Sequence, residues 1–247
     1  MNNNVIAIWG SPSSGKTVTG MKLARELEMK KKNVIIIFAD LFCPVVSTVM
    51  PNVDVKNRTL GSLLSKPYIK QIDIMQTAIP YPKHEHIAII GYKNGDNIFT
   101  YSEFLAERVT ELIKELRNAA DYVIIDCSSV LTEDGFTTIA LQVSDKILRL
   151  CNADLKSFSY FTSHLPLISR AKFKLETHIK VLSNIKEGQE ENTFRSVYGD
   201  VVYNLPHVKE IEPQFYSAGL LDPLKGKNAK NYNAEIKKIS REVFELG

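Results

Sequence analysis

The residues from Gly10 to Thr17 have the types and spacing best suited to chemistry, because they read Gly-Ser-Pro-Ser-Ser-Gly-Lys-Thr and match the phosphate-loop pattern GxxxxGK[ST]. Glycines let such a loop curl so that N–H groups point at phosphate oxygens, and the following helix presents its positive end to them. We predict that Lys16 bridges the β- and γ-phosphates of a nucleoside triphosphate and that the Thr17 hydroxyl binds Mg²⁺. The alternative is an ordinary glycine turn, which the flanking apolar run and helix-forming stretch disfavour.

The whole loop and the residue after it form the expected nucleotide contact. Pro12 removes one backbone donor from this loop and stiffens it. The predicted nucleotide-binding residues are Gly10, Ser11, Pro12, Ser13, Ser14, Gly15, Lys16, Thr17 and Val18.

Two acidic residues follow predicted buried strands, at the edge where ligands bind in open parallel sheets. Asp126 ends the run Tyr122-Val123-Ile124-Ile125-Asp126, and Asp40 follows the strand after the phosphate-loop helix. We predict that Asp126 holds Mg²⁺ through a water and that Asp40 orients or polarises the attacking water, so that both act with Lys16 in catalysis. The alternative for each carboxylate is that it caps the start of a loop.

Strands and helices alternate along the chain, which predicts an α/β fold: a doubly wound, mostly parallel sheet with helices on both faces. Continuous apolar runs such as Val34-Ile35-Ile36-Ile37-Phe38 indicate central strands that are covered on both faces. The predicted strands are Val5–Trp9, Asn33–Ala39, Ile87–Tyr92, Tyr122–Asp126, Lys146–Cys151, Ile179–Leu182 and Val201–Tyr203. The predicted helices are Lys16–Lys30, Tyr101–Asn118, Phe136–Val143, Leu155–Ala171, Ile211–Ala218 and Asn233–Phe244.

Composition agrees with one folded domain over residues 1–247, because 44% of the chain is hydrophobic and no linker or repeat divides it. The net charge of +3 neither demands nor excludes a weak contact with DNA or anionic lipid. The cysteines Cys43, Cys127 and Cys151 are widely spaced, which fits reduced thiols rather than disulfides or a zinc site. The N-terminal apolar run is too short for a signal peptide and no stretch could span a bilayer, so we expect a cytoplasmic protein.

Taken together, these motifs resemble the ParA/MinD-type deviant P-loop ATPases over nearly the whole chain. Asp40 is similar to the family's second acidic motif, and the run ending in Asp126 is similar to its Walker B motif. Asn184, which closes a predicted strand, matches the asparagine that reads the adenine edge, and Pro206 matches the proline whose loop packs against the base. The resemblance therefore implies that ATP with Mg²⁺ is the ligand. A turn residue after a strand is the alternative for Asn184.

The chain also departs from the family pattern. ParA and MinD carry a second lysine after the first glycine of the loop, which reaches the partner's phosphates across a dimer, and here that position is Ser11. Phe38 replaces the first acidic residue of the family's D-x-D motif, and Cys127-Ser128-Ser129 replaces the residues after its Walker B aspartate. The departures leave Lys16, Thr17 and Asp126 in place. They imply slow hydrolysis and leave a nucleotide-driven homodimer in question.

Within the family, the C-terminal segment favours the divergent group, resembling TadZ and CpaE, that localises secretion, pilus or conjugation machinery, because the related bacterial tyrosine kinases do not keep this segment. This resemblance implies a nucleotide switch for a protein partner, with Leu41–Ser47 and Cys127–Gly135 as switch segments. A ParA-like role in DNA segregation is one alternative. The cytoplasmic module of bacterial tyrosine kinases is another, although such kinases end in a tyrosine cluster and here only Tyr232 lies near the end. We do not expect membrane contact, because packing against the sheet explains the apolar stripe of the last helix equally well.

Overall fold

One sheet contains all the strands of the computed structural model, which describes residues 4–102 and 104–245. The strands are β1 (Val5–Gly10), β2 (Val34–Phe38), β3 (Ile79–Tyr81), β4 (His84–Gly91), β5 (Tyr122–Asp126), β6 (Lys146–Asn152), β7 (His178–Ile185) and β8 (Val201–Pro206). Their order is β3-β4-β2-β5-β1-β6-β7-β8, and only the β3–β4 pair is antiparallel. The predicted doubly wound, mostly parallel α/β fold is confirmed.

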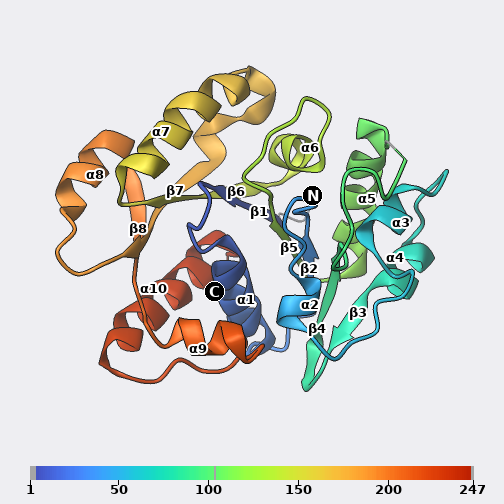
Figure 1. Cartoon of the computed structure of the whole chain (residues 1–247), viewed down its shortest axis with the longest axis horizontal. Helices are drawn as coiled ribbons and strands as arrows, with labels where there is room; N and C mark the ends of the chain where they lie inside the picture. Colours follow the sequence, from blue (N-terminus) through green and yellow to red (C-terminus); the bar gives the residue numbers. More distant parts are fainter. Residues whose placement is uncertain (1–3, 103, 246–247) are drawn as a thin grey trace.

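Helices cover both faces of this sheet, and an apolar core lies under each layer (Figure 1). The helices are α1 (Lys16–Glu28), α2 (Val46–Val49), α3 (Leu60–Leu64), α4 (Gln71–Thr77), α5 (Ala106–Ala119), α6 (Phe136–Val143), α7 (Leu155–His164), α8 (Glu191–Tyr198), α9 (Ile211–Tyr216) and α10 (Lys227–Val243). Side chains alternate along a strand, so Ile6 and Ile8 of β1 join the core under α1 and α10, whereas Ala7 and Trp9 join the core under α5, α6 and α7.

The central strands β2, β5 and β1 bring their carboxyl ends to one edge of the sheet. Strand β5 lies between the other two, and Asp126 is in register with Ile8 on one side and with Phe38 on the other. The loop after β1, the residues after β2 and Asp126 itself are therefore neighbours. Parallel pairing alone produces this meeting of distant segments.

Three predicted helix boundaries were wrong. Helix α5 begins at Ala106 rather than Tyr101, because the Tyr101 hydroxyl is engaged in a loop by Thr59 and Asp96; Glu103, which was included in the predicted helix, lies outside the described residues. Helix α7 ends at His164, before Pro166, whose ring nitrogen cannot donate to the preceding turn. Helix α10 begins at Lys227, because the buried stripe of its apolar face already starts at Ala229.

The short elements β3, α2, α3, α4 and α8 were not predicted. Strand β3 contains Pro80 and pairs only with β4 at the sheet edge, where a missing N–H is tolerated. Each of these elements is too short for a clear period in sequence. Among the described helices, none combines the length and apolar character that crossing a membrane would require.

Candidate nucleotide-binding site

The phosphate-loop motif forms a tight turn between β1 and α1. Gly15 and Ser13 both have positive φ angles, 79° and 59°. Gly10 lies against the backbone of β6, where an added Cβ would come within 2.1 Å of the Leu150 carbonyl oxygen. The loop thus needs glycine at two places for different reasons, namely a left-handed conformation at Gly15 and a close backbone approach at Gly10.

Lys16 reaches over this loop toward the segment after β5. Its Nζ donates to Ser129 Oγ at 2.6 Å and to the carbonyl oxygens of Ser11 and Gly10 at 3.3 and 3.5 Å. Loss of contact with water lowers the pKa of Lys16, while the carboxylates of Asp126 and Asp40 act in the opposite direction. The hydrogen bonds of the ammonium group are thus all to uncharged oxygen atoms, while the carboxylates of Asp126 and Asp40 lie close enough to stabilise its charge.

Asp126 and Thr17 place two oxygen atoms side by side at the start of α1. Thr17 Oγ1 donates to Asp126 Oδ2 at 2.6 Å, and Asp126 is only 5% exposed. Burial raises the pKa of Asp126 to about 6, although Lys16 and the Thr17 hydroxyl favour its ionised form. A nearby cation would stabilise the ionised form of this buried carboxylate.

This pair fits Mg²⁺, which prefers oxygen ligands and usually takes only one or two from protein. No group of three His, Cys, Asp or Glu side chains in the described part of the chain could hold a metal by itself. A magnesium ion here would depend on phosphate oxygens for the rest of its coordination. Thr17 and Asp126 are the residues that would hold it, directly or through a water.

Asp40 shapes the loop that follows β2. Its Oδ1 accepts hydrogen bonds from the backbone N–H groups of Phe42 and Cys43, at 3.0 and 3.2 Å. The loop-capping alternative is thus present in the structure. Asp40 nevertheless lines the same cavity, of about 490 Å³, as Lys16, Thr17 and Asp126. Its proposed action on an attacking water remains a prediction.

A second cavity, of about 240 Å³, also adjoins the phosphate loop. Asn184 and Pro206 both line it, together with Gly15 and Val18. Asn184 has a φ of 55°, and its Oδ1 lies 2.8 Å from His207 Nδ1. The residues predicted to surround a purine base therefore meet at one place, and His207 holds the Asn184 side chain in position.

Ser11 faces its own chain. It is 1% exposed, and its Oγ lies 2.8 Å from Ser157 Oγ at the start of α7. Ser157 Oγ also accepts from the N–H of Asn152, and its own N–H donates to the Asp154 carboxylate that caps α7. Ser11 thus ties the phosphate loop to α7 through a buried hydroxyl pair.

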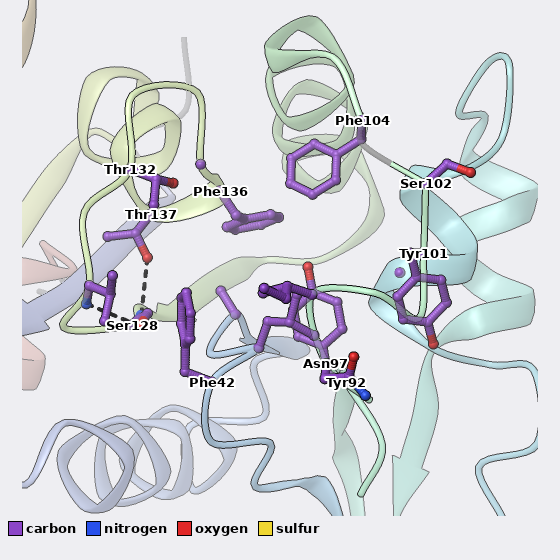
Figure 2. Close-up of a pocket in the computed structure, with 16 residues that line it drawn as sticks. Phe42, Tyr92, Asn97, Tyr101, Ser102, Phe104, Ser128, Thr132, Phe136 and Thr137 are labelled. Atoms are coloured by element: carbon purple, nitrogen blue, oxygen red, sulfur yellow. Dashed lines mark hydrogen bonds between the residues drawn. The ribbon is translucent and has the colours of Figure 1, made fainter. Parts of the chain in front are cut away.

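A third cavity, of about 270 Å³, adjoins the phosphate cavity and is lined mainly by aromatic and aliphatic side chains. Figure 2 shows the rings of Phe42, Phe104 and Phe136 around this space. Phe42, Ser128 and Val130 line both this cavity and the phosphate cavity. The loops after β2 and β5 are therefore shared walls, so that a movement of either loop changes the shape of both cavities.

Sequence reasoning missed two polar residues of the site. Ser129 bonds Lys16 Nζ and also donates from Oγ to the Gly10 carbonyl oxygen at 2.9 Å, and His207 fixes Asn184. Each lies only one to three residues beyond a predicted motif residue. Their positions next to Asp126 and Pro206 were the available signal, but their side-chain directions depend on loop conformation.

Comparisons with known proteins show the family of this chain and several solved structures of similar fold. Residues 4–181 match a family model described as an AAA domain. The fold is similar to a ParA family ATPase from Chlorobium tepidum TLS, with a TM-score of 0.77, 14% identity and coverage of 97% of this chain and 99% of that one. It is also similar to MinD complexed with Mg-ADP from Pyrococcus horikoshii OT3, with a TM-score of 0.72, 18% identity and coverage of 96% and 95%.

A MinC:MinD cell division complex from Aquifex aeolicus is a further structural neighbour, with a TM-score of 0.74, 14% identity and coverage of 99% and 97%. None of the curated protein sequences matches this chain. At these identities the solved structures share a fold with this chain, and the family match rests on the sequence itself.

Proposed function

This chain belongs to the AAA domain family and has the fold of ParA and MinD ATPases, and we propose that it is an ATP-binding switch that hydrolyses ATP slowly. The observation that supports this most is the meeting of Lys16, Thr17, Asp40 and Asp126 at one cavity beside the phosphate loop. We propose that residues 1–247 act as a single domain around that site.

We propose that Mg-ATP is the ligand. The phosphate loop and Lys16 would bind the triphosphate, and the cavity with Asn184 and Pro206 would take the adenine. Magnesium, held by Thr17 and Asp126, would neutralise charge on the β- and γ-phosphates. The solved MinD relative binds Mg-ADP, which supports the same nucleotide here.

We propose that Asp40 orients the attacking water and that the replacement of the family's second lysine by Ser11 makes turnover slow. The buried Ser11 hydroxyl is bonded within its own chain and offers no charge to a partner's phosphates. A neutral hydrogen bond is worth about 0.5–1.5 kcal/mol net, less than a charge-assisted contact.

The output of this switch is proposed to be a protein partner of a localisation or secretion machinery, in the manner of TadZ-like and CpaE-like proteins. Support comes from the shared walls of the phosphate cavity and the aromatic cavity, which link the γ-phosphate side to an apolar surface. The MinD of the Aquifex aeolicus complex binds the protein MinC, so this fold accommodates protein partners.

DNA segregation is the second candidate, since one structural neighbour is a ParA family ATPase, but the net charge of +3 does not favour it. The tyrosine-kinase alternative has less support. Tyr232 is 4% exposed in α10 and lines the proposed base cavity, so it is not available as a phosphorylated tail residue.

Hydrogen exchange with and without nucleotide tests the switch. With Mg²⁺ and a non-hydrolysable ATP analogue, segments 41–47 and 127–135 should exchange more slowly than with Mg-ADP, because only the triphosphate can contact both loops. Helix α10 serves as an internal control that should respond equally to both nucleotides. Equal protection of the two segments by ATP analogue and ADP would show that the loops do not read the γ-phosphate.

A further inference from the structure

Arg149 is a buried cation far from the phosphate loop in sequence. It lies in β6 and is only 7% exposed. Its guanidinium carbon lies 5.7 Å from the centre of the Phe161 ring of α7. An aromatic face attracts a cation only weakly, and a buried guanidinium ordinarily has a carboxylate and several hydrogen bonds.

Arg149 has neither of these. Throughout residues 4–102 and 104–245, no ion pair and no hydrogen bond involves its guanidinium, and its Nε is buried without a partner. Burial lowers the pKa of Arg149, and the group that opposes this is the Cys151 thiol. Burial in turn raises the pKa of Cys151 to about 12, so the thiol is neutral at pH 7 and supplies no counter-charge.

The neighbouring strand adds basic groups to the same place. Lys180 of β7 is in register with Arg149, and His178 lies two residues earlier. Lys180 Nζ donates to the Tyr198 carbonyl oxygen and is 3.9 Å from Asp200, whose side chain is exposed to solvent. Two cationic side chains, Arg149 and Lys180, thus lie side by side on neighbouring strands, and the carboxylate near Lys180 is exposed to solvent. The buried Arg149 charge, which has no counter-ion of its own, is costly unless an anion enters.

A pocket leads from the surface to Arg149. It has a volume of about 100 Å³ and lies between α7 and α8, which are neighbours over this end of the sheet (Figure 1). Its other walls are Phe158, Phe161, Thr162, Leu165, Val197 and Tyr198. Phe158 and Val197 are 45% and 49% exposed, so the entrance is open and apolar. One cation at the base and aromatic walls around it match a ligand with a charged head and a short apolar body.

We propose that this pocket binds a small carboxylate, with Arg149 as the group that pairs with the two carboxylate oxygens. Arginine presents its N–H groups in a planar fork that fits a carboxylate bidentately. A cavity of about 150 Å³ accommodates benzene, so 100 Å³ fits a carboxylate on a few carbon atoms. A free monocarboxylic acid and the glutamate side chain of a peptide share this chemistry. The site is separate from the nucleotide site, so its test does not depend on ATP binding.

The experiment titrates the protein with isobutyrate, with the neutral isostere isobutyramide, with sulfate, and with a capped Ala-Ala-Glu-Ala peptide, all at one ionic strength. Binding is followed by NMR shifts of the His178 ring, whose pKa is lowered to about 4 by burial and by the charge of Arg149. Neutralising that charge raises the pKa of His178, and a ligand bound elsewhere leaves it unchanged.

We expect saturable binding of isobutyrate or of the peptide, no binding of isobutyramide, and a rise in the His178 pKa. If isobutyrate binds more tightly the ligand is a free carboxylic acid, and if the peptide binds more tightly it is a glutamate side chain. Arg149→Met should lose at least about tenfold in affinity and keep its melting temperature, because a buried unpaired charge is replaced by an apolar side chain of similar length. Arg170→Met, a change at an exposed position, is the matched control and should bind as the wild type does.

Failure of both carboxylates to bind, equal binding by isobutyramide, or unchanged binding in Arg149→Met would overturn the proposal. Binding of sulfate in preference to both carboxylates would also overturn it, since the site would then select tetrahedral anions. Should Arg149→Met fail to fold, Arg149→Lys keeps the charge without the planar fork. The comparison of isobutyrate with isobutyramide on the wild-type protein decides the question in any case.

Discussion

Asp126 shows how one side chain can be unfavourable for the protein alone and favourable for a ligand. It is buried at the end of a central strand, its pKa is raised to about 6, and its Oδ2 accepts from Thr17. A cation placed at this oxygen pair would reverse the cost of burial, because opposite charge stabilises the ionised form. The proposed magnesium site and the perturbed carboxylate are thus two aspects of the same geometry.

Replacing Asp126 with asparagine should reduce the affinity for ATP in the presence of Mg²⁺ more than it reduces the affinity for ATP without the metal. Asparagine keeps an oxygen at this position but removes the charge that Mg²⁺ prefers. Calorimetry with and without Mg²⁺ measures both affinities, and Asp54→Asn at an exposed position is the control. Melting at pH 7 should be unchanged or higher, because the buried charge is gone. An Asp126→Asn protein with the wild-type enhancement by Mg²⁺ would exclude this role.

Among single residues, those tied to a strand end were predictable and those tied to a loop were not. Asp126 and Asp40 follow buried apolar runs, so their place at the sheet edge could be inferred from parallel pairing alone. Ser129 and His207 act through turns whose dihedral angles have no signature in this sequence. The inward direction of Ser11 could not be inferred either, because its partner Ser157 is 146 residues away.

At the scale of elements, the phosphate loop depends on the contact between β1 and β6. Gly10→Ala should lower the free energy of unfolding by about 1–3 kcal/mol or more, because a Cβ there would clash with the Leu150 carbonyl oxygen. Gly20→Ala is the matched control inside α1, where the nearest atom to a new Cβ is 3.4 Å away. It should raise stability by up to about 1 kcal/mol. Urea unfolding measures both, and a Gly10→Ala protein as stable as the wild type would refute the close approach.

Strand β7 contributes a pH dependence. Burial lowers the pKa of His178 to about 4, Arg149 adds to the effect, and the Phe173 carbonyl and Glu176 oppose it. The unfolded chain therefore binds more protons between pH 6.5 and 4, so stability should fall as pH decreases through this range. The loss should reach about 3 kcal/mol at most, at about 1.4 kcal/mol per pKa unit.

His178→Gln should flatten this part of the stability curve, whereas His86→Gln at the other side of the sheet should leave it as in the wild type. Urea unfolding at pH 7, 5.5 and 4 supplies the measurement. If the slopes of wild type and His178→Gln coincide, His178 is not the group responsible.

The central strands and the helices with long apolar stripes were predictable from sequence, because burial on both faces leaves continuous apolar runs. The short elements were not predicted, because they lack such a continuous apolar run or stripe. Strand β3 is three residues long with Pro80 in its middle, and helix α8 has no fully buried residue. The start of α10 was placed too late because polar residues flank Ala229 and Tyr232, the first two buried positions of its stripe.

At the scale of the whole molecule, the replacement of a lysine by Ser11 predicts weak self-association. Light scattering with Mg²⁺ and a non-hydrolysable ATP analogue should give a mass near that of one chain, 27.9 kDa, because Ser11 is bonded to Ser157 and carries no charge. A tight nucleotide-dependent dimer that dissociates in Ser11→Ala would show that the hydroxyl replaces the missing lysine.

Lys16 is proposed to hold the phosphates of Mg-ATP at the phosphate loop, and calorimetry of ATP binding to Lys16→Ala measures its contribution. We expect a loss of affinity of about 10-fold to 100-fold, the value of hydrogen bonds to a charged group, with an unchanged melting curve. Lys30→Ala, at an exposed position two residues beyond the end of α1, should bind as the wild type does. A folded Lys16→Ala protein that binds Mg-ATP with wild-type affinity would show that Lys16 does not hold the phosphates.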